Sequence, residues 1–157
     1  MLDGKQIIVL GERDGIAGPA IAACVKSAGG NVAFASTECF VCTASGAMDL
    51  NSQETIKRLA DEHGSEQLLV ILGAPDPESA EIAAETVVLG DPTYAGALAE
   101  VQLGLSVYHA LEEEFRSQID DEVWEDQIGV MADVLEADEI ATAVKGMRES
   151  KPEANGT

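Results

Sequence analysis

The chain has little positive charge. Its 157 residues include 9 Lys and Arg against 29 Asp and Glu, which gives a formal net charge of −20 at pH 7 and a pI near 4.1. Such a surface repels phosphate groups, so the composition argues against binding to nucleic acid or to an anionic membrane. We interpret the acidity as a solvated surface of an abundant cytoplasmic protein, with steering of partner proteins as the alternative.

Long apolar runs are also missing near the N-terminus. The run from Ile7 to Leu10 is far too short for the hydrophobic part of a secretory signal or for a membrane span. We therefore expect a cytoplasmic protein. In that reducing compartment, three cysteines, an odd number, indicate catalytic or free thiols rather than a disulfide framework.

The patterns of common metal and nucleotide sites are absent as well. A structural zinc site usually needs a second CxxC or HxxxH pair, whereas Cys24, His63 and His109 are widely scattered. The glycine-containing loop at residues 11–15 has neither the GxGxxG nor the Walker pattern. We therefore expect no bound metal and no bound cofactor.

The chain does contain a CxxC motif, formed by Cys39 and Cys42 between a predicted strand and a predicted helix. Two cysteines at this spacing can close a small ring on oxidation, or hold a thiolate beside a resolving thiol. The spacing thus predicts a dithiol redox site, and the alternatives are half of a metal site or two thiols that merely pack. Cys24 follows an apolar helical stretch and is expected to be an inert core thiol.

Strand-like and helix-like segments alternate along the chain. This order predicts one α/β domain over residues 1–150, a three-layer sandwich with a mainly parallel, doubly wound sheet of flavodoxin-like or Rossmann-like type. Residues 151–157 are predicted to be a flexible tail. The expected strands are 5–10, 32–35, 68–72 and 99–107, and the expected helices are 16–28, about 51–63, 78–89 and two within 112–147.

Polar residues follow several of these strands, where parallel sheets form their reactive crevice. Glu12, Arg13, the two motif cysteines, Asp76, Tyr108 and His109 are expected at this rim. An ordinary surface ion pair is the expected role of Arg13, and a hydrogen-bonded structural role that of His109, with stabilisation of a thiolate as the alternative for His109.

Local signals around the motif predict two helix starts. A helical turn beginning at Thr43 would direct its free N–H groups at Cys42 and lower the pKa of that thiol. Asn51 or Ser52 is the expected N-cap of the next helix, which ends at Gly64.

Further along the chain, the spacing of Phe115, Trp124 and Met131 indicates that these side chains pack in the core. We expect them to have no role in the chemistry.

The residues around the motif resemble those of selenoprotein A of the glycine, sarcosine and betaine reductase complexes. The similarity covers Cys-Phe-Val-Cys-Thr-Ala at 39–44, Gly-Ala-Met-Asp-Leu at 46–50, Gln53 with Ile56-Lys57, and the opening 4–20. In that family the second sulfur position of the motif is selenocysteine, so Cys42 stands where the family carries selenium. A replacement made for expression, a natural cysteine homologue and a selenocysteine rendered as cysteine all agree with the sequence.

The resemblance implies a carrier within a multi-protein oxidoreductase. A substrate-activating component B would transfer a carboxymethyl group to residue 42, with selenocysteine expected there in the native family. Cys39 would resolve the adduct as the acetyl unit passes to the acetyl-transferring component C, and thioredoxin would reduce the oxidised pair. The residues alone support a nucleophile paired with a resolving thiol. A general thioredoxin-like CxxC dithiol oxidoreductase and a non-catalytic interaction domain are the alternatives.

Overall fold

The centre of the fold is a sheet with the strand order β2-β1-β3-β4, and the computed structural model describes residues 1–43 and 46–151. All three strand pairings are parallel, which confirms the predicted sheet. The strands are β1 (Gln6–Glu12), β2 (Asn31–Glu38), β3 (Leu68–Leu72) and β4 (Ser106–His109).

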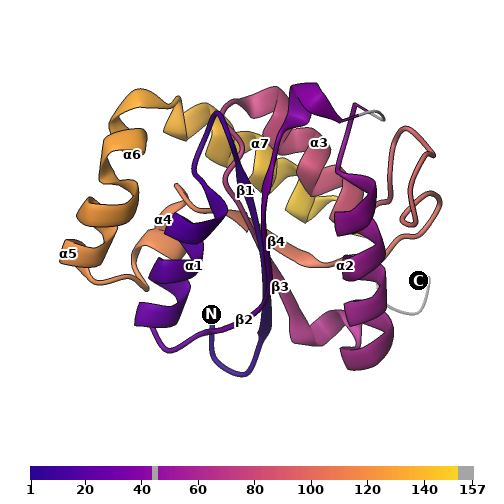
Figure 1. Ribbon diagram of the computed structural model, residues 1–157, viewed down its shortest axis with the longest axis horizontal. Helices are drawn as coiled ribbons and strands as arrows, with labels where there is room; N and C mark the ends of the chain where they lie inside the picture. Colours follow the sequence, from indigo (N-terminus) through magenta and orange to yellow (C-terminus); the bar gives the residue numbers. More distant parts are fainter. Residues whose placement is uncertain (44–45, 152–157) are drawn as a thin grey trace.

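Helices cover both faces of this sheet and complete the predicted three-layer sandwich of flavodoxin-like or Rossmann-like type (Figure 1). One face packs against α2 (Leu50–His63), α3 (Pro77–Val88) and α7 (Ala137–Glu149). The other packs against α1 (Gly18–Ser27), α4 (Glu113–Arg116), α5 (Asp121–Trp124), the π-helical turn η3 (Glu125–Gly129) and α6 (Val130–Val134). A 3-10 turn, η2 (Ser65–Gln67), leads into β3.

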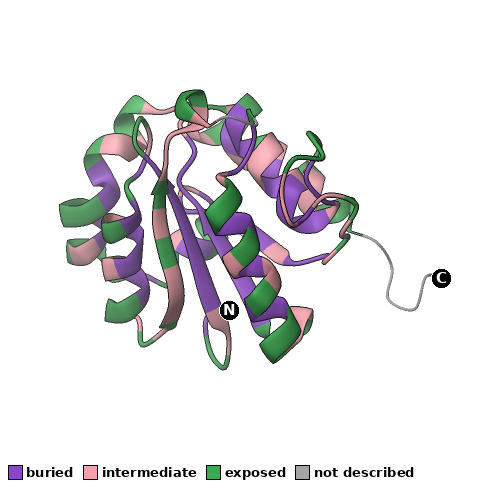
Figure 2. Ribbon diagram, turned by 45° about the vertical axis from the view of Figure 1, so that its right-hand side comes forward, coloured by how far each residue is buried: buried purple, intermediate pink, exposed green. Residues whose placement is uncertain are grey.

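Strand β1 shows why these apolar runs form buried strands. Successive side chains of a strand point to opposite faces, so Ile8 and Leu10 enter the core beneath α2 and α3, while Ile7 and Val9 enter the core beneath α1. Both faces of the strand are therefore buried, as Figure 2 shows for the central strands, and the exposed residues lie mainly on the outer helices.

Two strands extend further toward their carboxyl ends than predicted. The ladder between β1 and β2 continues through the pairs Gly11 with Thr37 and Glu12 with Glu38. Glu12 is expected in a loop because Gly11 ends the apolar run, but it belongs to β1, and its buried carboxylate accepts a hydrogen bond from Phe40. The longer strands bring the residues after β1 directly beside the residues after β2.

The predicted fourth strand, 99–107, is wrong in its first part, because β4 contains only Ser106–His109. The residues before it form a loop built on the buried carboxylate of Asp91, which accepts hydrogen bonds from the backbone N–H groups of Thr93, Ala95 and Gly96. Backbone conformations with positive φ at Glu100 and Gly104 also interrupt an extended strand there.

The predicted helices at 16–28, 51–63 and 78–89 are present with changed boundaries. Helix α1 begins at Gly18, two residues later than predicted, because Ala17 is extended and the N–H of Ile16 donates to the carbonyl of Gly73. The segment after Glu112 contains more pieces than the two predicted helices, although the predicted break near residue 136 does precede α7. Phe115 and Trp124 are buried and Met131 packs beside them, which confirms their assignment to the core.

The predicted flexible tail at 151–157 lies outside the described residues except for Lys151. Within the part of the chain that the structure describes, no helix is both long enough and apolar enough to cross a membrane.

Candidate active site

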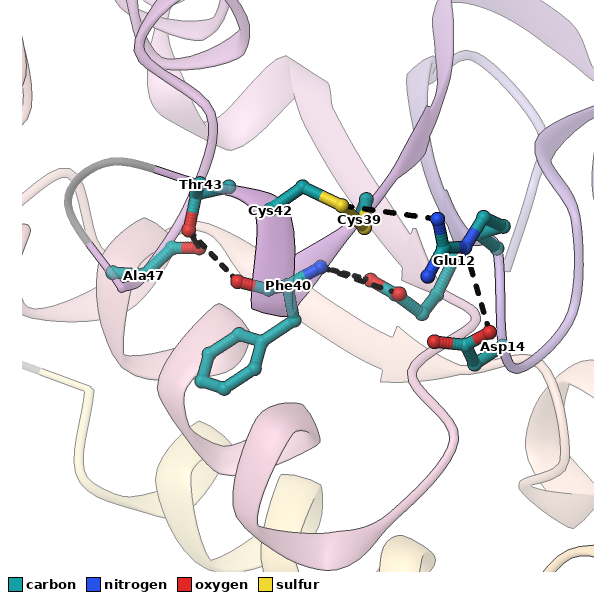
Figure 3. The surroundings of a disulfide bond; sticks show 8 residues. Glu12, Asp14, Cys39, Phe40, Cys42, Thr43 and Ala47 are labelled. Carbon is teal, nitrogen blue, oxygen red and sulfur yellow. Dashed lines mark hydrogen bonds and ion pairs between the residues drawn. A yellow bond between two sulfur atoms is a disulfide. The ribbon is translucent and has the colours of Figure 1, made fainter.

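The CxxC motif follows β2 at the carboxyl edge of the sheet, where the strand order predicted it. Cys39 comes directly after the strand, and Phe40–Cys42 form a 3-10 turn, η1, closed by a hydrogen bond from the N–H of Cys42 to the carbonyl of Cys39 (2.9 Å). Cys39 and Cys42 are joined by a disulfide (Figure 3). Cys42 is exposed, and Val41 between the sulfurs keeps 76% of its surface accessible, so the motif is open to a reaction partner.

The carboxylate of Glu12 supports this turn from below. Both of its oxygens accept a hydrogen bond from the backbone N–H of Phe40, at 3.3 and 3.2 Å, and Figure 3 shows Glu12 directed at that group. Burial raises the pKa of Glu12, and the hydrogen bond from Phe40 offsets part of this effect. A small cavity of about 30 Å³, lined by Glu12, Phe40 and apolar side chains such as Leu10, lies beside the carboxylate. Glu12 thus fixes the backbone between the two sulfurs.

A second carboxylate, Glu38, anchors the chain on the far side of the motif. One oxygen accepts a hydrogen bond from the N–H of Asp49 (3.0 Å), and the other accepts from the hydroxyl groups of Ser52 and Ser36 (2.9 Å each). These bonds join the end of β2 to the start of α2, so the segment around the cysteines is tied at both ends. Sequence reasoning missed Glu38, because its partners Asp49 and Ser52 lie 11 and 14 positions away along the chain.

The guanidinium of Arg13 lies beside the exposed sulfur. Its Nη1 is 3.8 Å from Sγ of Cys42, and its Nε is 3.5 Å from Oδ1 of Asp14. The backbone N–H of Arg13 donates to the carbonyl of Glu38 (2.8 Å), which holds the loop after β1 against the end of β2. The predicted surface ion pair therefore exists, and the same side chain also places a cation next to Cys42.

The predicted helical turn at Thr43 is contradicted at its first residue, and residues 44–45, over which it would continue, lie outside the described residues. Thr43 is extended and caps the C-terminal end of η1, its hydroxyl donates to the carbonyl of Phe40 (2.9 Å), and α2 begins only at Leu50. Cys42 therefore lies at the C-terminal end of η1, where carbonyl groups gather, and the next helix among the described residues begins only at Leu50. A cation near a thiol favours its thiolate form, and Arg13 is a described cation beside Cys42.

The start of α2 also differs from the prediction. Asp49 is the N-cap residue, and neither Asn51 nor Ser52 occupies that position, since both lie in the first turn of the helix. The hydroxyl of Ser52 is used in the bond to Glu38, so it does not cap the helix. The predicted C-terminal end at Gly64 is confirmed.

Other residues predicted at the rim serve the scaffold. His109 is fully buried, with Nε2 2.8 Å from the carbonyl of Ala74 and Nδ1 accepting from the N–H of Leu111 (3.1 Å). Burial lowers the pKa of His109 to about 4, so the ring is neutral at pH 7. Asp76 caps α3 through the N–H of Ser79, and the ring of Tyr108 lies under the guanidinium of Arg148.

The third cysteine stays apart from the motif. Cys24 is a free, fully buried thiol on α1, and burial raises its pKa to about 11. Both facts agree with an inert core thiol. Among residues 1–43 and 46–151, no group of three or more His, Cys, Asp or Glu side chains is arranged to hold a metal ion.

An open hollow of about 420 Å³ adjoins the disulfide. Its described lining comes from the end of β2, the motif itself and the start of α2. This lining contains two carboxylates and no cationic side chain, and its residues are Thr37, Glu38, Cys39, Cys42, Thr43, Asp49, Leu50 and Asn51. A small molecule in this hollow would meet both sulfurs.

Comparison with known proteins places this arrangement in a family. The model of the family described as "Glycine reductase complex selenoprotein A" matches residues 2–148. A glycine/sarcosine/betaine reductase complex component A from Clostridium botulinum is 54% identical over 94% of this chain and 94% of its own. Component A from Carboxydothermus hydrogenoformans is 56% identical, with 94% of this chain and 95% of the relative covered.

A third relative, component A1 from Peptoclostridium acidaminophilum, is 53% identical over 95% of this chain and 94% of its own. No solved structure matches the chain. Because the family model covers nearly the whole chain and the relatives match along almost their full length, this protein belongs to the glycine reductase complex selenoprotein A family.

Proposed function

We propose that this protein is the carrier component of a glycine, sarcosine or betaine reductase complex, with residue 42 as the nucleophile and Cys39 as the resolving thiol. The observation that carries the proposal is the disulfide between these two residues on an exposed turn of a chain from the selenoprotein A family. An exposed nucleophile with a resolving thiol within bonding distance is the minimum that such a cycle needs.

The cycle begins when a substrate-activating component B presents the two-carbon unit of glycine as an imine. The chalcogen of residue 42 attacks the methylene carbon, the carbon–nitrogen bond breaks, and the nitrogen keeps the electron pair. Water then hydrolyses the imine that remains on component B and releases ammonia. The product is a carboxymethyl group on residue 42. The exposure of Cys42 supports this step, since the attacking atom must reach a group held by another protein.

The second half of the cycle is reductive. The thiolate of Cys39 attacks the chalcogen of residue 42, so the bond between the two residues forms and the bond to carbon breaks. The carbon keeps the electron pair, and with loss of water the ketene-level acetyl unit passes to a thiol of component C as a thioester. Inorganic phosphate then displaces that thiol and gives acetyl phosphate. Thioredoxin then returns two electrons to the oxidised pair. Selenium favours both halves because a selenol is more acidic than a thiol and its bond to carbon is weaker.

Isotope-labelled glycine tests this proposal directly. The reduced protein is mixed with component B and ¹³C-glycine, and peptide mapping by mass spectrometry locates the label. We expect one carboxymethyl group at residue 42, none in Cys42→Ser, and an accumulating adduct in Cys39→Ser because the resolving thiol is missing. A version with selenocysteine at position 42 should form and release the adduct faster than the cysteine form.

The same mapping separates the alternatives. Label on Cys39, or rapid disulfide exchange with no label at all, would favour a general dithiol oxidoreductase. An interaction domain without thiol chemistry would leave both cysteines unlabelled and would not cycle with thioredoxin.

A further inference from the structure

The side chain of Arg13 is held over the CxxC turn from a neighbouring strand. The hydrogen bond from its backbone N–H to the carbonyl of Glu38 fixes where the side chain starts, and the contact with Asp14 engages Nε. The Nη1 end of the guanidinium then lies 3.8 Å from Sγ of Cys42. The N–H groups at the Nη end of the guanidinium can therefore donate hydrogen bonds to a group attached to that sulfur.

The other charged side chains named around the CxxC turn are carboxylates. Glu38 and Asp49 line the hollow beside the motif, and Glu12 lies beneath the turn. The whole chain carries a net charge of −20. A carboxylate that approaches the sulfurs therefore experiences repulsion from these groups, and Arg13 is the cation that the structure places against the exposed sulfur.

We propose that Arg13 binds the carboxylate of the two-carbon unit attached to residue 42, and that it thereby selects carboxylic-acid substituents over neutral ones. This inference rests on the proposed function for the identity of the attached group. In a carboxymethyl adduct one methylene separates the carboxylate from the chalcogen, so the carboxylate lies within reach of a guanidinium already in contact with the sulfur. The planar fork of arginine matches the two oxygens of a carboxylate, and its charge strengthens the hydrogen bonds.

Stabilisation of the Cys42 thiolate is a second effect of the same cation, and it must be measured separately. A change in thiolate population alters the rates of all alkylating agents equally, because each reacts with the thiolate. Binding of a carboxylate alters only the reaction of an anionic reagent. The ratio of rates for iodoacetate and iodoacetamide therefore isolates carboxylate recognition.

The experiment uses the reduced Cys39→Ser protein, so that Cys42 is the accessible thiol and Cys24 stays buried. With each reagent the sulfur–carbon bond forms, the carbon–iodine bond breaks, and iodide leaves with the electron pair. We expect Arg13→Gln to lower the iodoacetate-to-iodoacetamide ratio roughly two- to fivefold, the range for an exposed ion pair. The ratio for Arg13→Lys should lie between those of the parent protein and Arg13→Gln, because lysine keeps the positive charge but lacks the planar guanidinium.

Arg58→Gln is the matched control, since it removes one exposed arginine from α2, where Arg58 pairs with Glu62. It changes the net charge of the protein by the same amount and should leave the ratio at its parent value. Equal ratios in the Arg13→Gln and Arg58→Gln proteins would overturn the proposal and reduce Arg13 to a surface cation.

The finished adduct gives a second readout that does not depend on rates. Alkylation with ¹³C-carboxyl iodoacetate places an NMR-visible carboxylate on Cys42, and its pKa should be lower in the parent than in Arg13→Gln. Indistinguishable titration curves would contradict the proposal. Neither measurement involves partner proteins, so a failure of the labelled-glycine experiment would refute the proposed function and leave the result for Arg13 standing.

Discussion

At the scale of single residues, two opposite charges define the environment of the disulfide. Arg13 lies exposed beside Cys42 and favours an anion there, while the buried carboxylate of Glu12 fixes the N–H of Phe40. The two residues are adjacent in the chain, at the end of β1, yet one faces solvent and the other the interior. The end of β1 thus supplies both the cation beside Cys42 and the carboxylate that holds the backbone of the turn.

His109 shows the opposite relation, a titratable residue at the rim that serves stability. The pKa of His109 is lowered to about 4 in the folded protein. Between pH 6.5 and 4 the imidazole is therefore protonated in the unfolded chain but neutral in the folded protein. Its contribution to stability is therefore complete above pH 6.5 and is lost as the pH falls toward 4. By pH 5 the loss should be about 2 kcal/mol.

Urea unfolding between pH 7.5 and pH 5 measures this effect and stays above the pI of 4.1. Between pH 7.5 and pH 5 the free energy of unfolding of wild type should fall by about 2 kcal/mol more than that of His109→Gln. The carboxylates are common to both proteins, so their effect cancels and the difference reports His109. The matched control is His63→Gln, at the exposed end of α2, which should keep the wild-type profile. Parallel profiles for wild type and His109→Gln would show that the buried ring carries no such penalty.

At the scale of elements, the site depends on how closely β1 approaches α1. A Cβ on Gly11 would collide with the backbone of Gly18 and Ala17, which no side-chain rotation can relieve. Gly73, after β3, likewise lies against the carbonyl of Ile16. These contacts set the position of the loop that presents Arg13.

Substitution Gly11→Ala should therefore destabilise the protein by roughly 1–3 kcal/mol or more, the usual cost of overpacking. The matched control is Gly146→Ala in the last turn of α7, where a new Cβ meets nothing within 4 Å. That change should stabilise by roughly 0.5–1 kcal/mol, because alanine is the better helix former. Chemical denaturation of both variants provides the comparison, and an equal response would mean that the close approach at Gly11 is not a constraint.

At the scale of the whole molecule, the dominant property is the charge of −20 on 157 residues. Like charges repel one another more strongly in the folded chain than in the expanded unfolded chain. This repulsion therefore lowers the free energy of unfolding. The few cations are partly engaged in ion pairs, such as Arg148 with Glu112 and Lys57 with Asp61.

Added salt should therefore stabilise this protein. Raising NaCl from about 10 mM to 150 mM shortens the screening length from roughly 30 to 8 Å, and we expect Tm to rise by a few degrees. KCl at the same ionic strength should give the same shift, because screening depends on ionic strength. A Tm that is constant or falls with salt would indicate that the ion pairs outweigh the repulsion.

The sequence by itself determined that the sheet is parallel, that the CxxC motif lies at its carboxyl edge and that Cys24 is a core thiol. These features follow from patterns within short segments: apolar runs such as 68–72, the alternation of strand and helix, and the spacing of two cysteines. The family was also visible there, because its motif is a continuous run of residues.

Only the tertiary structure decided which groups surround the sulfurs. Arg13 meets Cys42 across 29 positions of the chain, and Glu12 meets Phe40 across 28. Thr43 is extended at the end of η1, and the carboxylate of Glu38 accepts a hydrogen bond from Asp49, 11 positions along the chain. Local sequence patterns encode propensity, whereas contacts between distant residues depend on strand register and on the close approach of elements, which exist only once the chain has folded.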